Sequence, residues 1–137
     1  TYATIQEGRV SSIIPARKCS AIWYGMIASH QSMFYNCEFL TEHKLEYDIS
    51  YRIAADYKLT SQVIQLSKDI LQTDICISLF DMSGVSNQNQ DAGLNEADRV
   101  RKELGYGLIT RKSIVFLQLL ARFVRNDMKG LYSKLRH

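Results

Sequence analysis

Residues 28–57, ASHQSMFYNCEFLTEHKLEYDISYRIAADY, contain the features from which the rest of the chain is best interpreted. The polar trio Ser29-His30-Gln31 stands directly before the apolar run Met33-Phe34-Tyr35. Further on, Asp56 follows Ile53-Ala54-Ala55, and a carboxylate behind so apolar a turn can have its basicity tuned by burial. The stretch therefore offers one candidate base and one candidate polar binding segment.

Local patterns before and within this stretch predict extended backbone followed by a short helix. Residues 3–14 mix β-branched side chains with Gly8, which favours an extended conformation. Residues 32–36 predict a short strand, because bulky Met, Phe and Tyr side chains suit a pleated surface. A short helix from Glu38 to about His43 is expected to follow.

The middle of the chain predicts a longer helix and a second strand. Ser50 is expected to cap a helix from about Arg52 to Lys68. Asp56 would then lie in the first turn, where the helix dipole favours a negative charge. Residues 74–81, DICISLFD, alternate well enough for a strand, and a polar loop over residues 83–90 follows.

Two further helices are predicted in the C-terminal third. One runs from about Asp91 to Leu104 and ends at Gly105, a residue type that favours helix C-termini. The other runs from about Lys112 to Leu135. Its apolar stripe consists of Leu117, Leu120, Val124, Met128, Leu131 and Leu135, with Arg122, Arg125, Lys129 and Arg136 away from it.

Length and composition indicate one globular domain over residues 1–137. The hydrophobic content is 46% and the charged content 23%, both ordinary for a chain with a real core. No apolar run approaches the roughly 20 residues that span a bilayer. The three cysteines form no C-x-x-C pair and the three histidines lie far apart, so a disulfide framework or zinc site is not expected and a reducing cytoplasm fits better.

Positive charge is concentrated at the C-terminal end. The segment 107–137 contains seven Lys or Arg residues and one acid, for a net charge of +6. The whole chain carries +3, so the remainder carries −3. This basic amphipathic tail could contact an anionic surface, either membrane or nucleic acid, or it could pack its leucine stripe in a core and leave the basic face in water.

Three segments, in their order and spacing, resemble the second half of a family 2 glycosyltransferase. They are S-H-Q-x-x-F-Y at residues 29–35, Y-x-x-x-Y-x-x-x-A-D-Y at 47–57 and Gly84-Val85-Ser86. The closest likeness is to bacterial enzymes that build colanic acid, amylovoran and related exopolysaccharides, and it covers nearly the whole chain. It implies an α/β fold, a short mixed sheet flanked by helices, corresponding to the C-terminal, acceptor-side part of a GT-A fold.

The resemblance also implies site residues. Asp56, followed by Tyr57, would be the general base that takes the proton from the acceptor hydroxyl during an inverting transfer. Ser29, His30 and Gln31 would face the donor diphosphate and the acceptor sugar. Gly84, Val85 and Ser86 would form a loop whose glycine lets backbone approach the ligand, and Arg52 could either pair with Asp56 or meet phosphate.

Each of these residues also has a purely structural interpretation. Asp56 could only stabilise a helix N-terminus. His30 could be an internally satisfied histidine beside an apolar segment, without being a ligand. The loop at residues 84–86 could be an ordinary turn.

The family's donor side has no counterpart in this sequence. Its members bind a metal-bound nucleotide-sugar through an Asp-x-Asp-like motif, since two carboxylates hold the divalent cation, and no such motif occurs here. The nearest acidic pair, Glu96 and Asp98, is expected to diverge on a helix. We therefore expect Mg²⁺ or Mn²⁺ to be needed by a full-length enzyme and none to be bound by this chain alone. The chain would be the C-terminal part of a longer enzyme and inactive by itself, because the donor- and metal-binding half is absent.

The expected partners are a nucleotide-sugar donor and a saccharide or lipid-linked saccharide acceptor. The expected location is the cytoplasm, with any contact with the inner membrane being peripheral. The expected assembly is a homo-oligomer. Two other functions stay open at this point. The chain could be a non-enzymatic interaction module, or a nucleic-acid binder that uses its basic helix. Against the last, the aromatic residues cluster away from the basic segment.

Overall fold

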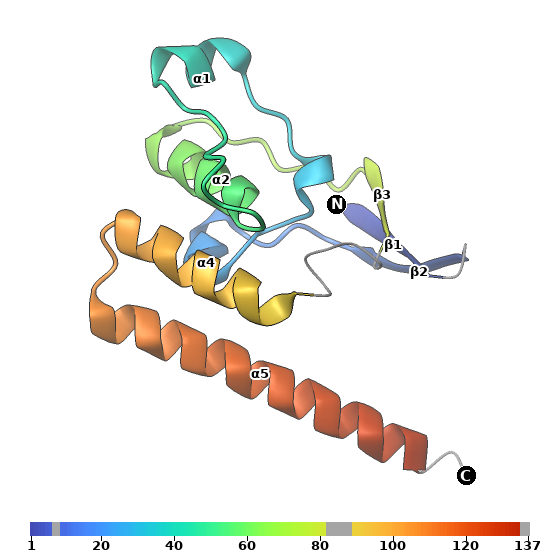
Figure 1. Ribbon diagram of the computed structural model, residues 1–137. Helices are drawn as coiled ribbons and strands as arrows, with labels where there is room; N and C mark the ends of the chain where they lie inside the picture. The colour runs from blue at the N-terminus through green and yellow to red at the C-terminus, as the bar shows by residue number, and fades with distance from the viewer. Residues whose placement is uncertain (7–8, 82–88, 135–137) are drawn as a thin grey trace. The chain divides into compact units, whose positions relative to one another are not determined.

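The computed structural model describes residues 1–6, 9–81 and 89–134 (Figure 1). They form a small mixed α/β protein with a three-stranded sheet and several helices. Two compact units make up the chain, Thr1–Val100 and Arg101–His137. None of the helices in the described ranges combines the length and the apolar character needed to cross a membrane.

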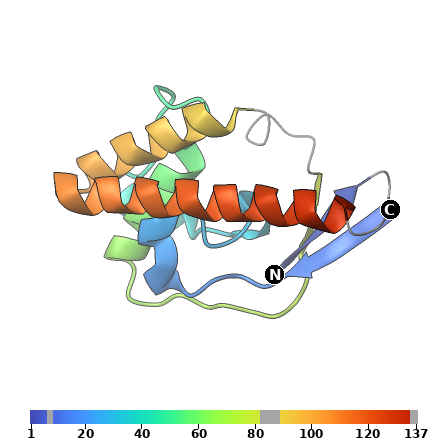
Figure 2. The ribbon, with the colours of Figure 1, turned by 90° about the horizontal axis from the view of Figure 1, so that it is seen from below.

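The sheet has the strand order β2-β1-β3 and is mixed, as predicted. The first strand, β1 (Tyr2–Gln6), pairs antiparallel with β2 (Arg9–Ile14) and parallel with β3 (Ser78–Asp81) (Figure 2). The extended conformation predicted for residues 3–14 is therefore confirmed for residues 3–6 and 9–14; residues 7 and 8 lie outside the described residues. The strand predicted over residues 74–81 is shorter than expected. Only its last four residues lie opposite β1, where their backbone groups find hydrogen-bonding partners.

The strand predicted over residues 32–36 is wrong. The 3₁₀ helix η2 (His30–Ser32) replaces its start, and residues 33–36 have no regular structure. The carbonyl of Ser29 accepts hydrogen bonds from both the backbone N–H of Ser32, at 2.9 Å, and its hydroxyl, at 2.8 Å. Such local serine bonds compete with a sheet ladder and favour a turn.

The helix predicted from Glu38 to about His43 is confirmed as α1 (Cys37–Glu42). Asn36 caps it, since its Oδ1 accepts hydrogen bonds from the backbone N–H groups of Glu38 and Phe39 at 2.8 and 3.3 Å. Asparagine is one of the residue types preferred at a helix start, so this cap depends on local sequence alone.

The next helix, α2 (Ala55–Leu66), begins three residues later than predicted, and Ser50 does not cap it. The Ser50 hydroxyl instead accepts a 2.9 Å hydrogen bond from Arg99. The Glu96 carboxylate, from the helix α4 (Gln90–Glu103), accepts hydrogen bonds from the three backbone N–H groups that precede α2. A side chain distant in sequence therefore fills the capping role that local sequence assigned to Ser50.

The core of the first unit lies on the buried face of α2. Tyr57, Leu59, Thr60 and Ser61 are the buried residues of this helix. The Tyr57 hydroxyl donates a 2.9 Å hydrogen bond to the carbonyl of Ile22, in the 3₁₀ helix η1 (Cys19–Tyr24). This bond attaches α2 to η1 and satisfies a hydroxyl that burial would otherwise leave unpaired.

The helix predicted from Asp91 to Leu104 is confirmed as α4, and it ends as expected. Gly105 has a φ of 86°, a left-handed conformation that glycine adopts without a Cβ penalty. The N–H of Gly105 bonds to the carbonyl of Lys102, and that of Tyr106 to the carbonyl of Arg101. This pair of bonds is a Schellman motif.

The last helix, α5 (Leu108–Lys134), starts four residues before the predicted position. Ile114 is buried, whereas Leu117, Leu120 and Val124 are between 45% and 48% exposed.

Candidate functional site

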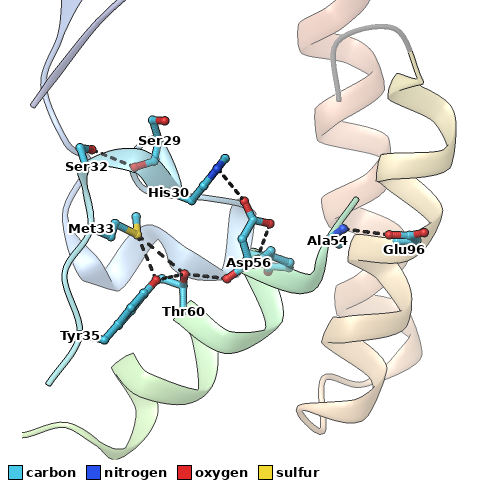
Figure 3. Close-up of polar contacts among 10 residues, drawn as sticks. Ser29, His30, Ser32, Met33, Tyr35, Ala54, Asp56, Thr60 and Glu96 are labelled. Carbon is cyan, nitrogen blue, oxygen red and sulfur yellow. Dashed lines mark hydrogen bonds and ion pairs between the residues drawn. The ribbon is translucent and has the colours of Figure 1, made fainter. Parts of the chain in front are cut away.

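The candidate site is formed where η2 meets the first turn of α2. His30 comes from the 3₁₀ turn and Asp56 from the helix, and the two side chains point toward one another (Figure 3). The distance from His30 Nδ1 to Asp56 Oδ2 is 3.3 Å. The fold thus brings together the two residues that sequence reasoning had singled out separately, and it makes them direct partners.

The Asp56 carboxylate is more enclosed than the imidazole beside it. The side chain of Asp56 is 23% exposed, and that of His30 is 48% exposed. Burial raises the pKa of the Asp56 carboxyl, and it outweighs the lowering effects of the Tyr57 backbone N–H, 2.7 Å from Oδ1, and of His30. A carboxyl with a raised pKa is a stronger proton acceptor once ionised, which suits a general base.

Hydrogen bonds also hold the backbone on both sides of the pair. Besides the two bonds from Ser32 to the Ser29 carbonyl, the N–H of Met33 bonds to the carbonyl of His30 at 3.1 Å. The Ser29 hydroxyl is buried, and no hydrogen-bond partner for it is found among the described residues. Gln31 is exposed. Of the predicted polar trio, only His30 contacts the candidate base.

A second row of hydroxyl groups supports the first turn of α2. Thr60 Oγ1 donates a 2.7 Å hydrogen bond to the backbone carbonyl of Asp56. The Tyr35 hydroxyl lies 2.8 Å from the same Thr60 oxygen (Figure 3). Burial raises the pKa of Tyr35, so this phenol stays protonated. The sequence analysis assigned neither Tyr35 nor Thr60 to the site. The only feature that could have indicated them is a polar group beside apolar neighbours.

Tyr57, Arg52 and the loop at residues 84–86 were the other predicted site residues. Tyr57 is 3% exposed, with its hydroxyl bonded to Ile22, so it supports α2 from inside the fold. The Arg52 side chain is exposed, and its backbone N–H bonds to Glu96; Asp56 pairs with His30 and not with this arginine among the described contacts. Gly84, Val85 and Ser86 lie outside the described residues.

A second polar cluster, around Lys58 of α2, was also missed. Lys58 Nζ lies 2.7 Å from Asp48 Oδ2, and this bond, with help from Ser50, lowers the pKa of Asp48. The ring of Tyr51 has Lys58 Nζ at 5.1 Å and Arg99 Cζ at 4.2 Å from its centroid. Both cations are within the range of a cation–π interaction, so the cluster fixes the loop that leads into α2.

The first unit also has a cavity of about 800 Å³. Its lining includes Met33, Tyr35 and Thr60 and the backbone stretch from Leu66 to Thr73. Its volume is in the range of small-molecule pockets. The hydroxyls of Tyr35 and Thr60 connect this cavity to the helical turn that bears Asp56.

Metal binding was expected only of a full-length enzyme. In residues 1–6, 9–81 and 89–134, no three His, Cys, Asp or Glu side chains gather closely enough to hold a metal ion. The Glu96 carboxylate, which belongs to the nearest acidic pair in the sequence, accepts three backbone N–H groups instead.

Comparisons with known proteins add nothing to this geometry. The chain matches no protein-family model, no curated protein and no solved structure.

Proposed function

We propose that this chain is the acceptor-side part of an inverting glycosyltransferase of the GT-A type. The reaction would transfer a sugar from a nucleotide-sugar to a hydroxyl of a saccharide or lipid-linked saccharide, in bacterial polysaccharide synthesis at the cytoplasmic side of a membrane. The sequence resemblance over residues 29–57 motivates this proposal. The observation that carries it is the position of Asp56.

Asp56 has the properties required of the basic centre in such a transfer. It lies in the first turn of α2, burial raises the pKa of its carboxyl, and its Oδ2 is paired with the exposed imidazole of His30. An acceptor hydroxyl is a weak nucleophile until a base removes its proton as it attacks. An ion pair that only stabilises a surface does not require an enclosed carboxylate. A base whose pKa is tuned by burial does require one.

The chemistry asked of this chain is limited to the acceptor. The acceptor oxygen forms a bond to the anomeric carbon from the face opposite the leaving diphosphate, and the configuration at that carbon is inverted. The diphosphate leaves with the electron pair of the broken carbon–oxygen bond. A donor-binding half would hold the nucleotide and its cation.

The test is to express the complete natural reading frame that encodes this chain and supply it with UDP- and GDP-hexoses, Mn²⁺ and oligosaccharide acceptors. Release of nucleoside diphosphate that depends on acceptor is expected. Asp56→Asn should reduce turnover by about 10²–10⁴-fold, the usual contribution of a general base, with donor affinity unchanged.

A matched control is Asp74→Asn, which removes an exposed acid between α2 and β3. Near-normal turnover of Asp56→Asn, or no acceptor-dependent release with any nucleotide-sugar of the set, would refute the proposal. Loss of turnover in both variants would indicate a general effect of charge or stability.

A further inference from the structure

The His30–Asp56 pair leaves one imidazole nitrogen available as a base. Asp56 Oδ2 is 3.3 Å from His30 Nδ1, and an ionised carboxylate can only accept a hydrogen bond. The carboxylate beside Nδ1 therefore favours the neutral tautomer that has its hydrogen on Nδ1, because a lone pair there would face a negative charge. In that tautomer, Nε2 has a free lone pair and can accept a proton.

Access favours the imidazole over the carboxylate as the group that meets a substrate. Both Asp56 oxygens already have partners, because Oδ1 accepts the Tyr57 backbone N–H and Oδ2 faces His30. The His30 side chain is 48% exposed, about twice the exposure of Asp56, at 23%. A hydroxyl group that approaches from solvent therefore reaches the imidazole more readily than the carboxylate.

We propose that His30 Nε2 is the atom that takes the proton from the acceptor hydroxyl, and that Asp56 acts through it. This proposal rests on the function proposed above and specifies its proton path. His30 is then the catalytic residue, and Asp56 is a positioning residue that fixes the tautomer and stabilises the imidazolium formed. The arrangement is a histidine–aspartate dyad.

The balance of the step is complete with groups already named. The O–H bond of the acceptor breaks and an Nε2–H bond forms, while the acceptor oxygen bonds to the anomeric carbon and the diphosphate leaves with its electron pair. The positive charge on the imidazole is compensated by the Asp56 carboxylate. The proton then passes to water, because His30 is exposed.

The dyad is held in place before any substrate binds. The turn that bears His30 is closed by three hydrogen bonds, two from Ser32 to the Ser29 carbonyl and one from Met33 to His30. The backbone of Asp56 is held by Thr60 Oγ1. Preorganisation of this kind is what a catalytic pair needs and what a chance surface ion pair lacks.

The first experiment measures the tautomer of His30 by ¹⁵N NMR on this chain at alkaline pH. The wild type should show hydrogen on Nδ1 of His30. Asp56→Ala removes the acceptor, and His30 should shift toward the tautomer with hydrogen on Nε2, which free imidazole in water favours. His43, whose Nδ1 lies 3.0 Å from the Phe39 carbonyl, is an internal control that should not change.

An Nε2–H tautomer of His30 in the wild type would overturn the proposal, and so would a tautomer that Asp56→Ala leaves unchanged. If Asp56→Ala fails to fold, Asp56→Asn serves as the second variant. It keeps the side-chain size and is expected to move the tautomer in the same direction, because its amide can also donate to Nδ1.

The second experiment separates the proton path from the function itself. In the complete reading-frame product, His30→Gln should lower kcat by about 10²–10⁴-fold with KM within about twofold. Glu42→Gln, at an exposed position of α1, should leave both unchanged. Full activity of His30→Gln alongside an inactive Asp56→Asn would overturn the dyad and leave the proposed function standing. Absence of transfer in the wild type would overturn the proposed function, and the proton path with it.

Discussion

Removal of the Glu96 carboxylate should loosen the start of α2, and with it the turn that bears Asp56. Oε1 of Glu96 accepts the Arg52 N–H at 3.1 Å, and Oε2 accepts those of Ile53 and Ala54 at 2.7 and 2.8 Å. The residue at the N-cap position is alanine, which supplies no side-chain hydrogen bond of its own. Glu96→Ala therefore leaves these N–H groups to water.

The expected loss in the free energy of unfolding is about 2 kcal/mol. A lost N-cap costs about 0.5–2 kcal/mol, and a negative charge at a helix N-terminus contributes roughly 0.3–1 kcal/mol. Glu96→Gln keeps one oxygen but turns an amide NH₂ toward a backbone donor, so it should cost about 1 kcal/mol. For a domain of this size, these losses correspond to about 6 °C and about 3 °C in Tm.

The effect should depend on pH in a defined direction. Burial alone would raise the pKa of the Glu96 carboxyl, but the three backbone N–H groups and Arg99 lower it below its ordinary value. A lowered pKa in the folded state means that the stabilisation is fully present above the unfolded value of about 4.3. It is lost as pH falls through the folded-state pKa. The two variants should therefore approach the wild type in stability at acidic pH.

Thermal unfolding followed by far-UV circular dichroism, at neutral pH and in acid, measures this effect. Glu42→Gln, which neutralises an exposed glutamate on α1, is the matched control and should change Tm by less than about 1 °C. The reasoning is refuted if Glu96→Ala melts with the wild type at neutral pH, or if its deficit persists undiminished in acid.

Three further predictions concern the charges and the exposed apolar surface. Because burial raises the pKa of Asp56, protonation of this carboxyl stabilises the folded state at acidic pH, and the benefit is lost as pH rises through the folded-state pKa. The Tm of Asp56→Asn should therefore rise relative to that of the wild type from acid to neutral pH. A Tm difference that does not change with pH would contradict this prediction. Vesicles with acidic lipid should bind the chain, and the binding should weaken at high salt. Each change to Gln among Arg122, Arg125, Lys129 and Arg136 should lower the binding free energy by up to about 1 kcal/mol. Binding that does not depend on lipid charge and salt would exclude this electrostatic mechanism. Because Phe34 is 81% and Leu71 93% exposed, light scattering should detect a dimer or higher oligomer, and a monomer at high concentration would count against a surface that needs covering.

Local sequence determined those elements whose signals lie within one turn of the chain. Asn36 caps α1 with its own side chain, and Gly105 ends α4 because it adopts a positive φ. The extended start was predictable from its β-branched residues, and β1 and β2 occupy it. Each of these features depends on the conformational preference of one residue and its immediate neighbours, so no knowledge of packing was needed.

The tertiary structure decided where α2 begins and what Asp56 contacts. Ser50 was a reasonable cap by type, but Glu96, on another helix, reached the free N–H groups, and the start moved to Ala55. Asp56 and His30 were each recognisable as candidates, yet nothing in the sequence made them partners at 3.3 Å. A side chain bonds to whichever group the packed chain brings within reach, and that distance is set by contacts between elements far apart in sequence.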